Sequence, residues 1–330
     1  MGDVEQLEQL EMLARAFLTA YDLRVERLIL LRTLNNVVFK VETGSTTLAP
    51  VYVLRIHRLG YRSVAETRSE LLYVQALRES TGLLVPIPLP NAAGDLVTIV
   101  GAEGCEEPRH CDVLTWLDGR VLRPGQGFGP HAAYQLGAAL GRVHHCSERF
   151  IPPAGFHLPR WDADGLFTVA SPYRPGPIDM LFAPEHWAMF QAVENQVRAT
   201  FKVLGSGPGE FGVIHADFIL GNCLFHRRTP RVVDWDDCGW GYYLYDLCPL
   251  LGNFKDYPSY RRLRQAFLDG YRSVRCLPRE HEQFIDLLIA ARHATSCLWV
   301  VGNRRNGGLG PDMAEHIAYR MGEVRQYLAA

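Results

Sequence analysis

The sequence predicts an α+β protein of two lobes, with a β-rich N-terminal lobe at residues 1–116 and a mainly helical C-terminal lobe at residues 117–330. Three observations lead to this prediction. Strand-like apolar runs are concentrated in the first third of the chain, and helical periodicity dominates after Pro124. The run from Trp116 to Gly119 has the character of a hinge between them. A chain of 330 residues is long enough for each lobe to bury its own core.

The N-terminal lobe should open with an amphipathic helix, because apolar residues from Leu7 to Leu18 recur at helical spacing. A second helix is expected from about Ser63 to Glu79, with Ser63 as its N-cap and Glu66 completing a capping box. The expected strands are LILLRTL at 28–34, VVFKVET at 37–43, VYVLRIH at 51–57, LVTIV at 96–100 and VLTWL at 113–117.

The C-terminal lobe is expected to be helical apart from a short apolar strand, GVI, and a pair of strands. That pair consists of CLFH at 223–226 and RVVDW at 231–235, joined by a connection from Arg227 to Pro230. The expected helices cover about 130–148, 185–203, 258–275, 279–301 and 312–328.

Composition excludes several classes of function. A formal net charge of −2 gives no support to nucleic-acid or membrane-surface binding by bulk electrostatics. No stretch approaches the ~18 consecutive apolar residues that cross a bilayer. The eight cysteines include no Cys-x-x-Cys pair, so we expect small buried hydrophobes in a reducing, cytoplasmic compartment. The oligomeric state stays open between monomer and homodimer.

The segment from His215 to Asp246 carries the chemistry. Asp217 follows an apolar strand, Asn222 comes five residues later, and the strand pair returns the chain to Asp234. Mg²⁺ prefers oxygen ligands and retains several waters, so one carboxylate, one amide oxygen and the phosphates of ATP are sufficient to hold it. A further carboxylate nearby can accept the proton of an attacking hydroxyl. This set of side chains suits phosphoryl transfer.

The same segment resembles the aminoglycoside phosphotransferase and choline kinase-like superfamily, in particular its phosphotransferase enzyme family and homoserine kinase-like branches. HADFILGNCLF is similar to the family's His-Gly-Asp-x-x-x-x-Asn-x-Leu pattern, and VVDWDDCGWGYYLYDLC to its second pattern, which ends in Asp-Leu-Ala. The resemblance implies a protein-kinase-like bilobal fold, ATP and Mg²⁺ as cofactors, Asp217 as catalytic base, and Asn222 and Asp234 as metal ligands. It also implies that His215 orients the catalytic loop and that Asp246 braces it.

In kinase-like folds a cation on the third strand pairs with a glutamate of the next helix and grips the phosphates. Arg55 is the cation inside VYVLRIH, and Glu70 is its expected partner, with Glu66 as the competing one. Asp236 is assigned either to a second metal or acceptor contact, or to a solvated or capping pair with Asp237.

Two further contacts to the nucleotide are expected. The loop between the first two strands lacks glycine, so Asn35 and Asn36 are expected to turn the chain there, since Asn tolerates left-handed conformations. Backbone groups of Thr115, Trp116 and Leu117, in the hinge, are expected to hydrogen-bond the adenine edge.

The acceptor is a small molecule with a hydroxyl group in this interpretation. Residues 251–330 contain 12 Lys and Arg against 8 Asp and Glu, which favours a neutral or anionic acceptor over a polycation. Two rival functions are a bacterial Ser/Thr protein kinase of the same superfamily and a non-catalytic nucleotide-binding scaffold. The scaffold is disfavoured because Asp217, Asn222 and Asp234 are all present.

Overall fold

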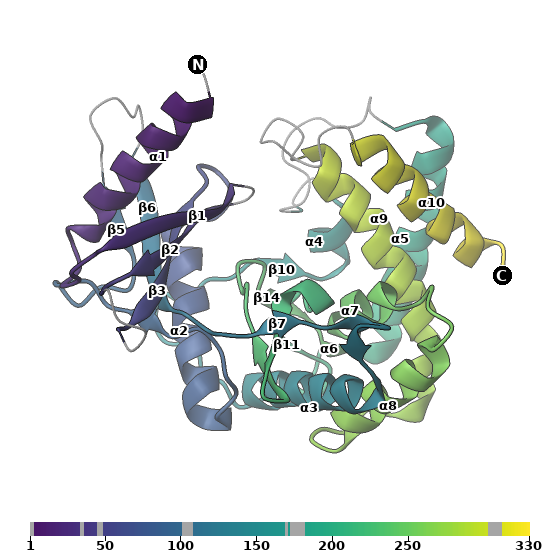
Figure 1. Cartoon of the computed structure of the whole chain (residues 1–330). Helices are drawn as coiled ribbons and strands as arrows, with labels where there is room; N and C mark the ends of the chain where they lie inside the picture. The colour runs from purple at the N-terminus through teal and green to yellow at the C-terminus, as the bar shows by residue number, and fades with distance from the viewer. Residues whose placement is uncertain are drawn as a thin grey trace. The chain divides into compact units, whose positions relative to one another are not determined.

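The computed structural model describes residues 3–33, 36–44, 49–100, 108–168, 171, 182–302 and 312–330 (Figure 1). The chain folds into two compact units. Unit 1 consists of Met1–Arg78, Val85–Leu117 and Pro153–His157, and unit 2 of Glu79–Leu84, Asp118–Pro152 and Leu158–Ala330.

Unit 1 contains an antiparallel sheet in the order β1-β2-β3-β6-β4, with β5 also paired to β6. The helix α2 begins with the expected capping box: Ser63 donates its amide to Glu66 at 2.8 Å, and Glu66 donates its amide to the Ser63 hydroxyl at 3.2 Å. The elements are α1 (Asp3–Leu18), β1 (Arg27–Thr33), β2 (Asn36–Glu42), β3 (Val51–His57), α2 (Val64–Thr81), β4 (Pro88–Leu89), β5 (Thr98–Val100) and β6 (Arg109–Thr115).

The two helices of unit 1 pack on opposite faces of the sheet, because successive side chains of a strand point to opposite faces. Leu54 and Ile56 of β3 join a buried cluster with α1, which includes Phe17. Arg55 lies between them in the sequence and therefore faces α2, where it meets Glu70. The alternation of β3 thus brings one charged residue under the helix that supplies its partner.

The strand expected at 113–117 extends further toward the N-terminus and covers Arg109–Thr115. His110 and Asp112 break its apolar pattern, although both are buried. Asp112 lies directly opposite Arg55 in the β3–β6 register. A search for runs of apolar residues misses such a strand, because some of its buried residues are polar. Asp112 is paired with Arg55, and His110 contacts the hydroxyl of Thr67.

Unit 2 holds two three-stranded sheets, ordered β10-β14-β11 and β13-β12-β7, together with most of the helices. Its strands and 3₁₀ turns are β7 (Arg120–Val121), β8 (Arg123–Pro124), β9 (Gly127–Phe128), β10 (Arg160–Trp161), β11 (Phe211–Ile214), η2 (Leu220–Asn222), β12 (Cys223–His226), β13 (Thr229–Val232), β14 (Gly239–Tyr242) and η3 (Arg279–Phe284). Its helices are α3 (Pro130–Ser147), α4 (Ala163–Phe167), α5 (Pro184–Leu204), α6 (Tyr243–Asp246), α7 (Cys248–Asn253), α8 (Tyr260–Arg272), α9 (Ile285–Gly302) and α10 (Met313–Leu328).

Two expectations for unit 2 are corrected. The β12–β13 connection is a two-residue turn, Arg227–Arg228, rather than four residues, because Thr229 already pairs with His226. Both arginines have positive φ, 48° and 67°, as a two-residue hairpin turn with the twist of the strands requires. The strand β14 was not expected, since its sequence, GWGY, lacks an alternating apolar pattern.

The backbones of helices α3 and α8 pack in direct contact, because each helix has a glycine at the contact point. A Cβ at Gly137 would lie 1.9 Å from the carbonyl oxygen of Phe267. A Cβ at Gly270 would lie 1.9 Å from the carbonyl oxygen of Tyr134. The backbones therefore approach in a way that larger residues would prevent.

One described helical stretch, Arg279–Gly302, is long and apolar enough by composition to span a membrane, and 72% of its apolar window is buried inside the protein. Burial to that extent is typical of the central helix of a folded core. Six of the described cysteines are buried and Cys276 is exposed, and all seven are free thiols.

Candidate active site

The loop after β11 is held by the carboxylate of Asp246. This side chain is fully buried and accepts hydrogen bonds from the backbone amides of His215 and Ala216, each at 2.8 Å. Ala216 has a φ of 62°, in the left-handed region that residues with a Cβ rarely adopt. Since the amides of Ala216 and of the residue before it bind one carboxylate, the position of Asp217 after this strained turn is well defined.

His215 links this loop to the segment after β13. Its Nδ1 accepts from the amide of Asp217 at 3.3 Å, and its Nε2 lies 3.1 Å from the carbonyl oxygen of Val233. An accepting Nδ1 places the proton on Nε2, which then donates to that carbonyl. The buried ring also lies 4.5 Å from the Trp235 ring, measured between centroids. Both ring nitrogens are therefore used in joining two backbone segments.

Asp217 and Asn222 are in direct contact. Asn222 donates from Nδ2 to the backbone carbonyl of Asp217 at 3.0 Å and to its Oδ2 at 2.9 Å. Arg292 of α9 forms an ion pair with Oδ1 of the same carboxylate. Because Nδ2 of Asn222 is used in this contact, Oδ1 is the atom of this side chain that suits a cation.

Asp234 lies next to this pair, because the amide of Val233 donates to the carbonyl of Asn222 at 3.0 Å. Asp234 itself has a φ of 64°, a conformation that Asp adopts more readily than most residues. Among the described residues no three His, Cys, Asp or Glu side chains are grouped to hold a metal. A cation at Asn222 and Asp234 would thus complete its oxygen shell with water or phosphate, as Mg²⁺ commonly does.

Charges around Asp217 act on its acidity in opposite directions. Burial raises the pKa of Asp217, the guanidinium of Arg292 lowers it, and the carboxylates of Asp237 and Asp234 raise it, for a net increase. Asp237 therefore belongs to the acidic group around Asp217, although the sequence suggested no role for it. Asp236 is similarly buried, but the main charges acting on Asp217 do not include it.

In unit 1, Arg55 forms ion pairs with two carboxylates. Its Nη1 lies 2.8 Å from Glu70, and its Nε and Nη2 donate to the two oxygens of Asp112, each at 3.0 Å. Asp112 is fully buried and contacts Nε2 of His57 at 2.6 Å. Burial raises the pKa of Asp112, but the charge of Arg55 and the contact with His57 outweigh burial and lower it. Asp112 and His57 are thus partners of Arg55 that the sequence pattern did not indicate.

The other nucleotide contacts expected in unit 1 are only partly described. Asn35 lies outside the described residues. Asn36 does not turn the chain but begins β2, because it is buried and pairs opposite His57 of β3. In the hinge, the amides of Thr115 and Trp116 donate to the carbonyls of Ile87 and Val51, at 2.9 and 3.0 Å. Those two amides are therefore engaged in the sheet.

Comparison with known proteins identifies the chain. Residues 30–283, more than half of its length, match the model of the family described as "Phosphotransferase enzyme family". The chain belongs to this family. It is accordingly a phosphotransferase of the kinase type, with the helix-and-sheet fold that such enzymes share.

Three relatives illustrate the similarity. An uncharacterised protein of Deinococcus radiodurans is 28% identical over 290 residues, which cover 86% of this chain and 78% of that protein. A microcompartment-associated aminopropanol kinase has a TM-score of 0.80 at 26% identity, covering 96% of this chain and 97% of that one. An amicoumacin kinase, solved with AMP-PNP and Ca²⁺, has a TM-score of 0.79 at 19% identity, covering 96% and 93%, and shows the shared fold.

Behind the loop that carries Asp217 in this phosphotransferase lies a polar network that sequence reasoning missed. His144 of α3 is fully buried, with Nε2 at 3.0 Å from Asp246 and Nδ1 at 2.8 Å from the Tyr271 hydroxyl of α8. Arg275 donates to that hydroxyl at 2.9 Å. Burial lowers the pKa of His144 despite its bond to Asp246, so the ring is neutral and donates to the carboxylate from Nε2. The only signal in the sequence is the glycines that allow α3 and α8 to approach.

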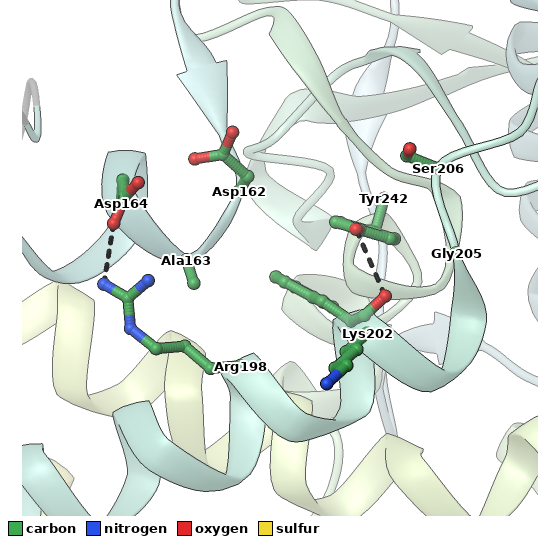
Figure 2. Close-up of a pocket in the computed structure, with 9 residues that line it drawn as sticks. Asp162, Ala163, Asp164, Arg198, Lys202, Gly205, Ser206 and Tyr242 are labelled. Atoms are coloured by element: carbon green, nitrogen blue, oxygen red, sulfur yellow. Dashed lines mark hydrogen bonds and ion pairs between the residues drawn. The ribbon is translucent and has the colours of Figure 1, made fainter.

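A cavity of about 440 Å³ in unit 2 is distinct from these residues (Figure 2). Its lining includes Asp164, Arg198, Lys202 and Tyr242, and none of the side chains predicted for catalysis. Arg198 is already paired with Asp164 at 2.7 Å, an ion pair drawn in Figure 2. We therefore do not assign the phosphotransferase reaction to this cavity.

Proposed function

We propose that this enzyme transfers the γ-phosphoryl group of ATP to a hydroxyl group of a small molecule, with Asp217 as the base. The observation that carries the proposal is the contact of Asp217 with Asn222 at 2.9 Å, next to Asp234 on the following hairpin. The three side chains offer a proton acceptor and two oxygen ligands within one loop and one hairpin of unit 2.

Mg²⁺ is the proposed metal, and Oδ1 of Asn222 and the carboxylate of Asp234 would hold it. When bound, the cation neutralises charge on the transferred phosphoryl group. Asn222 also holds Asp217 through Nδ2, so one side chain sets the base and contributes to the metal site. Asp237 is proposed to make a further contact to the metal or the acceptor, because its charge acts on Asp217. The same role for Asp236, which the sequence suggested, has less support, because Asp236 is not among the main charges acting on Asp217.

Asp217 would accept the proton of the acceptor hydroxyl at one of its carboxylate oxygens. Its raised pKa makes it a better proton acceptor than an exposed aspartate. Arg292, which is ion-paired with this carboxylate, acts against the rise in the pKa of Asp217 and so favours the ionised form that can accept a proton. His215 and Asp246 position this carboxylate through the backbone bonds of the loop, as proposed positioning residues.

For the nucleotide we propose Arg55 as a phosphate contact, held by Glu70 and Asp112, which together engage three of its five N–H groups. Leu117 is the proposed amide donor to adenine, since the amides of Thr115 and Trp116 are used in the sheet. The fold neighbour solved with AMP-PNP and Ca²⁺ supports use of ATP and a divalent cation. Free thiols throughout the described residues support a cytoplasmic location.

The test measures ADP release from Mg-ATP with choline, homoserine, sugars, aminoglycosides and casein as acceptors. Replacing Asp217→Asn should lower the acceptor-stimulated rate by roughly 10²–10⁴-fold, the usual contribution of a positioned base. Asp95→Asn, at an exposed turn, is the matched control and should retain the wild-type rate. A folded chain that binds ATP but releases ADP with none of these acceptors contradicts the proposal. Stimulation by casein alone would assign the enzyme to protein kinases instead.

A further inference from the structure

A cluster of basic side chains on α9 and α10 lies beside the catalytic aspartate. We call Arg292, His293, His316 and Arg320 the basic cluster. Arg292 forms an ion pair with Asp217, and Nη1 of Arg320 donates to Nδ1 of His293 at 3.0 Å. Ser296 contacts Nε2 of His316 at 3.1 Å, on the same two helices. The cluster therefore extends from the proposed base along the interface of α9 and α10.

The electrostatic surroundings of His293 are strongly positive. Burial and the charges of Arg320, Lys255, Arg292 and His316 together lower its pKa to about 3. Burial and the charge of Arg292 also lower the pKa of Arg320. These four charges repel one another, and Asp217 is an acid that the basic cluster contacts directly, through Arg292.

Two acids near α10, Glu323 and Asp256, contact side chains outside the basic cluster. Glu323 accepts from Lys255 at 2.8 Å, and Asp256 accepts from the hydroxyl of Tyr319 at 2.6 Å. The main charges that act on His293 are all positive, so an anion entering there would lower the energy of the basic cluster.

Two buried donors of the cluster have no acceptor among the described residues. They are Nε of Arg320 and Nε2 of His293. Because Nδ1 of His293 accepts from Arg320, its Nε2 carries the proton and is a donor. A buried N–H group without an acceptor costs free energy, whereas an anionic oxygen would supply one.

We propose that the basic cluster binds an anionic group of the acceptor, a carboxylate or a phosphate ester, so that the substrate is a small hydroxylated anion. This inference rests on the proposed function, since it places the acceptor's hydroxyl at Asp217. Arg292 contacts Asp217 directly, so an anion held by Arg292 would lie beside the base. An amino alcohol, the acceptor named for the aminopropanol kinase, would meet the wrong charge here.

The experiment compares three acceptors that differ in one group on the same hydroxylated carbon skeleton: lactate, propylene glycol and isopropanolamine. ADP release with Mg-ATP should be fastest with lactate, by at least tenfold in kcat/KM over the other two. Glycerate and glycerol phosphate, tested alongside glycerol, decide between a carboxylate and a phosphate ester as the anion. A preference for isopropanolamine or propylene glycol that is abolished by Asp217→Asn would overturn the inference and leave the proposed function intact.

Variants and a binding measurement make the result independent of turnover. Arg320→Gln should lower the lactate-to-propylene glycol ratio of kcat/KM about tenfold, the effect of losing about 1.4 kcal/mol of binding. Arg325→Gln on the same helix, with its side chain 64% exposed, is the matched control and should keep the wild-type ratio. Calorimetric titration of the wild type with glycerate and glycerol phosphate should show binding that Arg320→Gln weakens and Arg325→Gln preserves. Equal binding by all three chains, or none by the wild type, refutes the basic cluster as an anion site even if no acceptor turns over.

Discussion

His144 offers the sharpest test of how the fold supports the loop that carries Asp217. Its imidazole is fully buried and connects Asp246, at 3.0 Å, to the hydroxyl of Tyr271, at 2.8 Å. Replacing His144→Ala removes both hydrogen bonds and leaves a cavity the size of a ring. The carboxylate of Asp246 keeps its hydrogen bonds from two backbone amides, and the Tyr271 hydroxyl keeps its hydrogen bond from Arg275. Neither group therefore loses all of its hydrogen-bond partners.

The expected loss follows from these contacts. Each lost hydrogen bond to a buried, still partly satisfied group contributes about 1 kcal/mol. Truncating a fully buried side chain to alanine adds about 2 kcal/mol for lost packing and the cavity. The free energy of unfolding should therefore fall by roughly 3–5 kcal/mol, which is a large part of the stability of an ordinary domain.

The matched control is His145→Ala, the next residue of the same helix. The side chain of His145 is 44% exposed and takes part only in contacts at the surface. Its replacement should change the free energy of unfolding by no more than about 0.5 kcal/mol. The two substitutions remove the same atoms from neighbouring positions, so their difference measures what burial of the His144 ring and its two hydrogen bonds contribute together.

The assay is urea unfolding followed by tryptophan fluorescence. Five of the six tryptophans, including the buried Trp161 and Trp235, lie in unit 2, so the signal reports mainly on the unit that contains His144. The urea concentration at the midpoint of unfolding should fall in His144→Ala, while the slope of the free energy of unfolding against urea concentration stays the same. If His144→Ala and His145→Ala differ by less than about 1 kcal/mol, the network does not support the loop and the reasoning is refuted.

Two further predictions concern packing and pH. Gly137→Ala should destabilise the protein by about 1–3 kcal/mol, because its Cβ would lie 1.9 Å from the Phe267 carbonyl oxygen. Gly322→Ala should stabilise it by about 0.5–1 kcal/mol, because this glycine lies within a helix and an added Cβ would meet no atom within 4 Å. Thermal denaturation of both variants checks this, and equal effects would contradict it. The pKa of His293 is about 3 in the folded protein against 6.5 ordinarily, so as pH falls below about 6.5 the unfolded chain takes up the proton first and stability is lost. Between about pH 6 and pH 4 the free energy of unfolding should therefore decline less steeply in His293→Gln than in the wild type, by up to about 1.4 kcal/mol per pH unit. Urea unfolding at several pH values measures this decline. The same decline in both proteins would show that His293 does not titrate as argued.

The order of helices and strands followed well from local patterns. The capping box of Ser63 and Glu66 and the strand β3 depend on residues a few positions apart, and the structure contains both. The pattern failed at β6, where Asp112 interrupts an apolar run, and at β14, where small residues replace it. In both strands the stabilising partners lie on other elements, which periodicity does not report.

The proposed site divides in the same way. Asp217, Asn222 and Asp234 were recognisable because a hairpin of few residues brings them together. The remaining partners come from far along the chain. Arg292 lies 75 positions from Asp217, and His144 lies 102 positions from Asp246. No spacing rule connects such residues, since only the packing of helices sets their distance.

By itself, the sequence determined that this chain is a phosphotransferase and where the residues proposed for catalysis lie, because Asp217, Asn222 and Asp234 fall within one short loop and the hairpin after it. The tertiary structure decided what surrounds that segment. Close contact of α3 and α8 at Gly137 places His144 behind Asp246, and the pairing of α9 with α10 gathers cations beside Asp217. Coulomb and hydrogen-bond energies depend on distance in space, and the fold sets that distance for groups that the chain keeps far apart.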